Sequence, residues 1–287
     1  MPITVYRFQT MSYFTFLAIF LVIPILILLG EAWRNACTEF SRIGRFATLV
    51  SFDSYPAAVA LLGHILIALL YTTPWDNYLV ATRVWWYDPA LVTGIVLGWV
   101  PIEEYTFFIL QPIFTGLWLF FWMRRLPVNE RVQWESGKLR ITAVSLLGML
   151  WLAMIGILLG GWKPGTYLAL QLGWALPPIM LQLAFGADIL WKHRRLVFLA
   201  IVPTTLYLSG ADAIAIQAGT WTIDPSQSLG WLIGGILPFE EFLFFLNTNV
   251  LVVFGMTLLL ARESQSRLKK LGGTQRVTEK TQRVTEI

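Results

Sequence analysis

The stretch Pro101-Ile-Glu-Glu-Tyr-Thr-Phe-Phe108 occurs a second time as Pro238-Phe-Glu-Glu-Phe-Leu-Phe-Phe245, 137 residues further along the chain. Upstream of it, Trp85-Trp-Tyr-Asp-Pro89 matches Trp221-Thr-Ile-Asp-Pro225 at an offset of 136 residues. The difference between the two offsets requires a single inserted residue in the second copy. Because the order and the spacing of the motifs are both kept, an internal duplication explains the match better than chance does. The sequence therefore predicts two related halves.

This duplication divides the chain into four parts. The first half is expected over residues 1–130 and the second over 162–262, each with three membrane-spanning helices. Residues 131–161 then form a loop and a linker helix, and 263–287 form a polar tail that ends in a direct repeat. Because the linker helix returns the chain to the side from which it started, both halves begin on the same side. We expect parallel repeats, related by an axis near the membrane normal.

The composition indicates a chain that folds in lipid. Of its 287 residues, 56% are hydrophobic and 13% are charged, whereas a soluble domain carries about 25% charged residues. A helix needs about 20 apolar residues to cross the hydrocarbon core. That length criterion is met seven times, over residues 12–33, 56–73, 95–123, 140–161, 166–190, 196–211 and 230–260. The predicted fold class is an all-α membrane protein of about seven transmembrane helices.

The distribution of positive charge predicts the orientation in the membrane. Of the 21 Lys and Arg residues, 18 lie in alternate connecting segments and in the tail, and 3 lie in the remaining segments. Cytoplasmic loops carry the excess of positive charge in membrane proteins. The N-terminus is therefore expected outside and the C-terminus in the cytoplasm, with the protein in the cell membrane. The net charge of +4 is concentrated in the loops and the tail and is explained by membrane orientation. We therefore expect no nucleic-acid partner.

The duplicated motif places acidic side chains in apolar surroundings. Neither residues 91–123 nor residues 229–261 contain a Lys or Arg. Ionised groups are costly in the membrane, so acids within it are functional candidates by default. Desolvation and crowding favour the neutral carboxylic acid, which is the form that a general acid requires. The predicted catalytic residues are Glu103, Glu104, Glu240 and Glu241.

Aromatic residues follow the acids at helical spacing. Each acid is followed four residues later by a Phe, so that acid and ring share a helix face. Aromatic faces attract cations and could shelter a carbocation from water, although packing alone would also explain any single ring. The predicted substrate-binding residues are Phe107, Phe108, Phe244, Phe245 and Tyr105.

Four further residues are expected to support the site. Pro101 and Pro238 precede the acids and either begin a helix or interrupt one, and the length of residues 91–123 suggests a bend or a re-entrant piece before Pro101. Asp76 and Asp212 correspond at the 136-residue offset. They are expected at the outer ends of their helices, either as caps or as groups that orient a glutamate.

Several cofactor-dependent classes are not indicated by the sequence. The single cysteine, Cys37, cannot form an internal disulfide or a cysteine-clustered metal site. With 2 histidines the chain has no cluster for a metal ion, and it has no glycine-rich dinucleotide or phosphate-binding motif in a suitable context. We expect neither a metal nor an organic cofactor.

The two Pro-x-Glu-Glu-x-x-Phe-Phe motifs resemble those of the integral-membrane lycopene cyclases, in which two small subunits or two fused domains each carry one motif. The resemblance covers nearly the whole chain except the tail. It implies a fused lycopene cyclase, an isomerase of carotenoid biosynthesis without a flavin. One departure from equivalence is that Leu110 stands where the second half has Asn247.

The implied reaction fits the acidic and aromatic residues. An acid protonates the terminal double bond of a linear carotenoid, an internal double bond attacks the cation, and a base removes a proton. The substrate would enter from the lipid bilayer. A β ring is the favoured product, although the sequence leaves the ring type open, because β and ε rings differ only in which proton is removed. A composite site that closes one end at a time is expected, because both motifs lie near one face of the membrane. A proton-coupled carrier, or a cyclase of a longer or one-ended carotenoid, is the alternative; the sequence does not indicate the oligomeric state.

Overall fold

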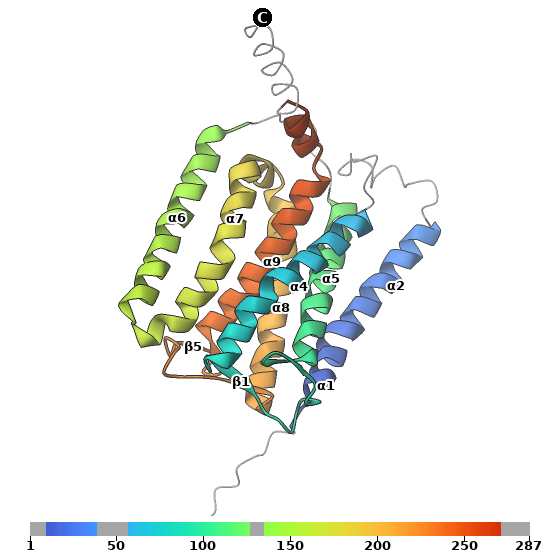
Figure 1. Ribbon diagram of the computed structural model, residues 1–287. Helices are drawn as coiled ribbons and strands as arrows, with labels where there is room; N and C mark the ends of the chain where they lie inside the picture. The colour runs from blue at the N-terminus through green and yellow to red at the C-terminus, as the bar shows by residue number, and fades with distance from the viewer. Residues whose placement is uncertain (1–9, 39–56, 127–134, 271–287) are drawn as a thin grey trace, which may run out of the picture.

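The computed structural model describes residues 10–38, 57–126 and 135–270. These residues form a bundle of long helices with short strands at one end (Figure 1). The direct repeat at the end of the predicted tail lies outside the described residues, of which the last are helical over 262–270.

Within the described residues, seven helical segments are long and apolar enough to cross a membrane. The first combines α1 (Tyr13–Leu17), a π-helical turn (Ala18–Val22) and α2 (Ile23–Thr38). The others are α4 (Ala57–Ala81), α5 (Ile102–Arg125), α6 (Gly137–Gly160), α7 (Thr166–Lys192) with the short 3-10 turn Lys163–Gly165 before it, α8 (Arg194–Ala218) and α9 (Phe239–Leu260). The predicted all-α membrane class with seven spans is confirmed, and the chain is an integral membrane protein.

Large apolar side chains on the outside of the bundle fit this environment. Leu70 and Leu181 are 68% and 73% exposed, and Leu159 is 84% exposed. In water such a surface would be an aggregation hazard, whereas lipid tails solvate it. The linker helix α6 lies at the edge of the bundle beside α7 (Figure 1).

Two predicted spans begin later than their apolar runs indicate. Residues 95–101 and 230–238, predicted as the first turns of long helices, instead contain tight hairpins. These hairpins pair β2 (Val96–Leu97) with β3 (Val100–Pro101) and β5 (Leu232–Ile233) with β6 (Leu237–Pro238). Glycines explain the difference, because Gly98 and Gly234 have φ values of 72° and 62° that other residues rarely adopt. The bend expected before Pro101 is confirmed in this form.

Two other spans continue further than predicted. Helix α4 runs through Pro74 to Ala81, and α8 runs on to Ala218. Asp76 and Asp212 therefore lie inside helices and are 1% exposed, so the predicted capping or loop position is wrong. Proline removes one backbone donor from a helix, but the residues after Pro74 pack inward and the helix continues.

One strand from each half pairs with the other at the end of the bundle that carries the hairpins. Strand β1 (Trp85–Tyr87) pairs antiparallel with β4 (Trp221–Ile223), with Trp86 opposite Thr222 at the centre. On either side, Asp88 N donates to Thr220 O (3.1 Å) and Asp224 N donates to Val84 O (2.8 Å). Asp88 and Asp224 are 136 positions apart, and so are Val84 and Thr220. The two bonds are therefore equivalent, as a two-fold relation between the halves requires.

The first helices of the halves obey the same relation. Tyr13 N donates to Leu91 O, and Tyr167 N donates to Gln227 O, at 2.8 and 2.9 Å. Leu91 and Gln227 differ by 136 positions, whereas Tyr13 and Tyr167 differ by 154. The larger offset arises because the connection after α2 is longer than the one after α7, where α8 follows almost at once.

Candidate active site

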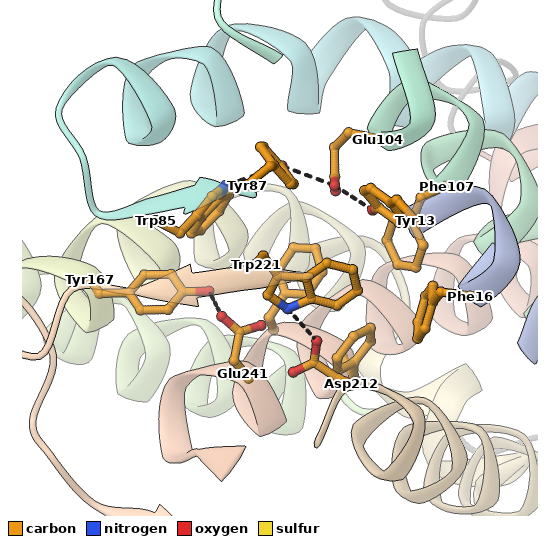
Figure 2. A pocket seen from close by; sticks show the side chains of 12 residues that line it. Tyr13, Phe16, Trp85, Tyr87, Glu104, Phe107, Tyr167, Asp212, Trp221 and Glu241 are labelled. Carbon is orange, nitrogen blue, oxygen red and sulfur yellow. Dashed lines mark hydrogen bonds between the residues drawn. The ribbon is translucent and has the colours of Figure 1, made fainter. Parts of the chain in front are cut away.

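A cavity of about 50 Å³ lies among the helices beneath the β1–β4 pair. We call it the acid cavity. Figure 2 shows that side chains from both halves point into it. Its lining residues are Tyr13, Phe16, Trp85, Tyr87, Glu104, Phe107, Tyr167, Asp212, Trp221, Glu241, Phe244 and Phe245. Matching residues of the two motifs therefore meet at one place.

One glutamate from each motif faces this cavity and accepts hydrogen bonds from phenols. The Tyr13 hydroxyl and the Tyr87 hydroxyl (3.0 Å) both donate to Oε2 of Glu104. The Tyr167 hydroxyl donates to Oε1 of Glu241 at 2.7 Å. Because Glu104 and Glu241 lie in the first turns of α5 and α9, the helix dipoles also favour negative charge there.

Tyr87 lies on β1, outside the spanning helices, and its protonation state follows from its surroundings. Burial, reinforced by the nearby Asp76 and Glu104 carboxyls, raises the pKa of the Tyr87 hydroxyl well above its usual value. The phenol therefore stays neutral and remains a hydrogen-bond donor at physiological pH. It gives Glu104 a second donor, whereas the corresponding position of the other half, Ile223, has none to offer.

Two aspartates complete a group of four neighbouring carboxyls. Asp212 Oδ1 accepts a hydrogen bond from Trp221 Nε1 at 3.0 Å, whereas neither oxygen of the buried Asp76 has a hydrogen-bond partner among the described residues. Both aspartates interact electrostatically with Glu104 and Glu241. A proton bound to any member of the group is thus felt by the others.

The other glutamate of each motif faces a loop instead of the cavity. Glu103 Oε1 accepts from Thr93 N at 2.6 Å, and Glu240 Oε1 accepts from Leu229 N at 2.7 Å. Both glutamates are fully buried, and the second oxygen of each has no hydrogen-bond partner. Glu103 and Glu240 therefore hold the chain that precedes each hairpin, and the structure places neither in the cavity lining.

The predicted aromatic residues are also divided. Phe107, Phe244 and Phe245 line the acid cavity, but Phe108 lines a second cavity deeper in the bundle. The Tyr105 hydroxyl donates to Leu97 O at 2.8 Å, which ties α5 to its hairpin and keeps this ring out of both cavities. Among the supporting residues, Pro101 and Pro238 end the strands β3 and β6 and lead directly into α5 and α9.

Sequence reasoning missed the residues that reach the acids from a distance. Tyr13 and Tyr167 contact glutamates 91 and 74 positions away, and Trp221 contributes an indole. A signal for the tyrosines was present, since each stands at the start of the first helix of its half. The change of offset from 154 to 136 residues concealed their equivalence.

No charged donor reaches the acid cavity from its lining, which contains neither Lys nor Arg. Within the described parts of the chain, no three His, Cys, Asp or Glu side chains are arranged to hold a metal ion. The chemistry that this arrangement can perform is proton transfer between carboxyls, in a chamber of aromatic rings that would stabilise a carbocation.

Comparison with known proteins agrees with this chemistry. A family model described as lycopene cyclase matches residues 40–123 and 164–259, which is more than half of the chain. The chain belongs to the lycopene cyclase family. The resemblance drawn from the two motifs is thereby confirmed at the level of the family, although the comparison does not identify the motif residues themselves.

Two relatives show how the family match extends along the chain. The lycopene beta-cyclase of Halobacterium salinarum is 38% identical over 251 residues, which cover 87% of this chain and 96% of the relative. The bifunctional lycopene cyclase/phytoene synthase of Podospora anserina is 36% identical over 203 residues, covering 68% of this chain and 34% of that protein. No solved structure matches the chain.

Proposed function

We propose that this protein is a lycopene β-cyclase, which closes the linear ends of lycopene into β rings at the acid cavity. The observation that carries the proposal is the meeting of Glu104 and Glu241, one from each half, in a chamber without lysine or arginine. The similarity to the Halobacterium salinarum lycopene beta-cyclase supports both the substrate and the ring type.

The reaction conserves atoms and electrons, so it requires no oxidant and no reductant. A carboxylic O–H bond breaks, and its proton bonds to the terminal double bond, leaving a tertiary cation. The electron pair of an internal double bond then forms the ring bond and moves the positive charge into the new ring. A carboxylate finally removes a ring proton, and the released electron pair becomes the ring double bond. The product is an isomer of the substrate.

The hydrogen bonds suggest how the two glutamates divide the work. A carboxylate only accepts hydrogen bonds, and Glu104 receives two, both on one oxygen. Glu241 receives one, from Tyr167 on Oε1, so its ionised form has fewer donors and it retains a proton more readily than Glu104. We assign Glu241 as the general acid and Glu104 as the base. Between cycles, Glu104 releases the proton that it has taken up and Glu241 is protonated again by exchange with solvent.

Aromatic rings surround the position that the cation would occupy. Phe107, Phe244 and Phe245 present faces or edges to the cavity, and ring faces stabilise positive charge without forming a bond to it. A lysine or arginine there would repel the cation, and water would quench it. The remaining predicted residues act indirectly: Glu103, Glu240 and Tyr105 fix the loops and hairpins that lead into α5 and α9. Asp76 and Asp212 tune the charge within the cavity.

The membrane setting of the site completes the proposal. The division into two three-helix halves over 1–130 and 162–262, a linker at 131–161 and a tail at 263–287 is part of it, as is a location in the cell membrane. The one-sided distribution of Lys and Arg supports an outer N-terminus and a cytoplasmic C-terminus. The acid cavity then lies toward the outer face. One composite cavity serves one end of the carotenoid at a time.

Turnover in heavy water tests this function directly. Purified protein in liposomes is supplied with lycopene, and products are analysed by absorption and mass spectrometry. We expect cyclised product with one deuterium for each ring closed, because the carboxylic proton exchanges with solvent. Unchanged lycopene would contradict the proposed function and would leave a proton-coupled carrier as the better reading. Cyclised product without deuterium would contradict the carboxylic-acid mechanism alone.

A further inference from the structure

A second and a third cavity follow the acid cavity in series along α9. The middle groove, of about 200 Å³, is lined by residues of four helices, namely His64, Ile67, Ala68, Tyr71, Thr72, Phe107, Phe108, Gln111, Pro112, Trp174, Pro178, Gln182, Phe244, Thr248, Leu251 and Val252. The end groove, of about 350 Å³, is lined by Leu181, Gln182, Phe185, Gly255, Leu258, Leu259, Ser264 and Leu268.

Shared lining residues make these three spaces neighbours in the fold. Phe107 and Phe244 line both the acid cavity and the middle groove, and their ring centroids lie 6.4 Å apart. Gln182 lines both the middle and the end groove. Beside Gly255, where a Cβ would meet His64 Nε2 at 2.1 Å, the His64 ring packs directly on the α9 backbone.

One face of α9 forms the floor of the whole series. Phe244, Thr248, Leu251, Gly255 and Leu258 recur at spacings of three or four residues, which places them in one row along the helix. From Glu241 to Leu259 the helix rises by about 27 Å at 1.5 Å per residue. This length is close to the roughly 30 Å of the hydrocarbon core.

The lining of the middle groove suits an apolar ligand although it contains polar residues. His64 Nδ1 pairs with Ala60 O (2.8 Å), and Gln182 Nε2 donates to Leu251 O (2.9 Å). Thr248 Oγ1 donates to Phe244 O at 3.0 Å. Among the described residues Gln182 Oε1 has no hydrogen-bond partner, but most of the groove is lined by carbon surface.

The corresponding region between α2 and α8 is occupied by larger side chains. Tyr71 OH donates to Trp174 O at the α4–α7 seam, and Tyr207 OH donates to Phe20 O at the α2–α8 seam, at 2.8 and 3.1 Å. In the second seam, however, Leu208 and Phe114 stand where the first has Thr72 and Leu251. These two larger side chains are buried in the same hydrophobic core as Phe16 and Phe245. The halves thus differ where a long ligand would lie.

We propose that the middle and end grooves bind the conjugated chain of the linear carotenoid, with one end of the molecule in the acid cavity. This inference rests on the proposed function. The occupant follows from the position of the grooves next to the acid cavity, from the carbon-rich lining, and from a length that matches an extended carotenoid across the membrane core. Access is from lipid, since Ile67 is 63% exposed and Leu181 is 73% exposed along the same grooves. The far end lies near Leu259 and cannot react until the molecule turns round.

Ala68→Trp tests the groove, with Leu66→Trp as its matched control. Ala68 lines the middle groove, whereas Leu66 is on the same helix, 57% exposed and outside the lining. We expect Ala68→Trp to raise the KM for lycopene at least tenfold in liposomes, while Leu66→Trp behaves as wild type. Equal KM values for the two variants would overturn the groove. Should Ala68→Trp fail to fold, Ala68→Leu is expected to give a smaller increase in the same direction.

A binding measurement separates this inference from the proposed function. In the Glu104→Gln/Glu241→Gln background, which should not turn over, lycopene held in the groove is expected to give an induced circular dichroism band. Adding Ala68→Trp should abolish that band and adding Leu66→Trp should not. If the lycopene band persisted with Ala68→Trp, the groove would not be the carotenoid site. The same would follow if Ala68→Trp displaced a copurified lipid from the protein while the lycopene band remained. A wild-type protein that binds lycopene with this pattern but never cyclises it would overturn the function alone.

Discussion

The two ends of the helix bundle hold their buried carboxyl groups in opposite ways. At the end near the hairpins, Glu104, Glu241 and Asp212 are held by phenol and indole donors. At the opposite end, Asp188 pairs with Arg267 (Oδ2 to Nη2, 2.7 Å), and the Glu263 carboxylate pairs with the Lys192 ammonium. Neutral donors leave a carboxyl free to gain and lose a proton, whereas a cation fixes it as a carboxylate. The difference separates carboxyls suited to chemistry from carboxyls that stabilise the fold.

The same contrast appears inside each duplicated motif. The first glutamate is fixed by a backbone amide of the preceding loop, and the second faces the cavity. Two adjacent residues on one helix therefore differ in role because they point in directions about 100° apart. Substitutions at these carboxyls and at their partners test both contrasts.

Replacing a cavity-facing glutamate should have the largest effect. Glu104→Gln or Glu241→Gln removes a group that must exchange a proton, so we expect turnover of lycopene to fall by about 10³-fold. Glu103→Gln and Glu240→Gln keep a carbonyl oxygen that can accept the loop amide, and we expect losses of less than about tenfold. Initial rates in liposomes measure both. A loss with Glu103→Gln as large as that with Glu104→Gln would erase the distinction within the motif.

The next effect concerns stability at the opposite end. Asp188→Asn leaves the Arg267 guanidinium, which is 11% exposed, without its counter-charge. Removing one partner of a buried pair costs about 3 kcal/mol or more, so the melting temperature in detergent should fall clearly. Lys270→Gln is the control, because its pair with Glu135 is exposed and contributes little. If Asp188→Asn and Lys270→Gln had the same melting temperature, the buried ion pair would not stabilise this end of the bundle.

Tyr87→Phe should give a smaller effect on catalysis. It removes one of the two donors to Glu104 and makes the first half resemble the second, in which Ile223 occupies the equivalent place. A hydrogen bond to a charged group contributes about 1.5 kcal/mol or more, which corresponds to about tenfold in turnover. Tyr78→Phe, at an exposed position of α4, serves as the control. Unchanged turnover in Tyr87→Phe would argue against Glu104 as the base.

The smallest effect is a dependence of stability on pH at Glu263. The His193 ring, with Nε2 3.6 Å from Glu263 Oε2, and the Lys192 ammonium lower the pKa of this carboxyl to about 2. A depressed pKa stabilises the fold fully above the ordinary value of about 4.5, and this contribution is lost as the pH falls through about 2. The difference in melting temperature between wild type and Glu263→Gln should therefore be constant near neutral pH and shrink below about pH 4.5. A difference that grew on acidification would contradict this pairing.

Much of the fold was predictable because lipid imposes simple length and charge rules. The spans follow from apolar runs such as residues 140–161, which the structure shows as α6 at Gly137–Gly160. The hairpins before α5 and α9 were not predicted as strands, because Ile95 to Val100 is as apolar as a helix and differs only in its glycines. Hydrophobicity alone does not distinguish two short paired strands from the first turns of a buried helix.

The site was predictable only in part, and the reason is geometric. The repeat identified both glutamates of each motif, but which of two adjacent acids faces the cavity depends on where the helix begins. That start is set by Pro101 and its hairpin, which the sequence placed within a continuous span. Tyr13 and Tyr167 come from helices whose packing against the motifs involves contacts far apart in the chain, which no local pattern reveals.

The pairing of β1 with β4 has a consequence for the biosynthesis of the protein. While the ribosome is still producing the second half, Trp85–Tyr87 has been inserted but its pairing partner, Trp221–Ile223, does not yet exist. The β1–β4 pair, and a cavity lined by side chains from both halves, can therefore form only after most of the chain has been translated. Until then the acidic groups of the first half have no complete chamber around them.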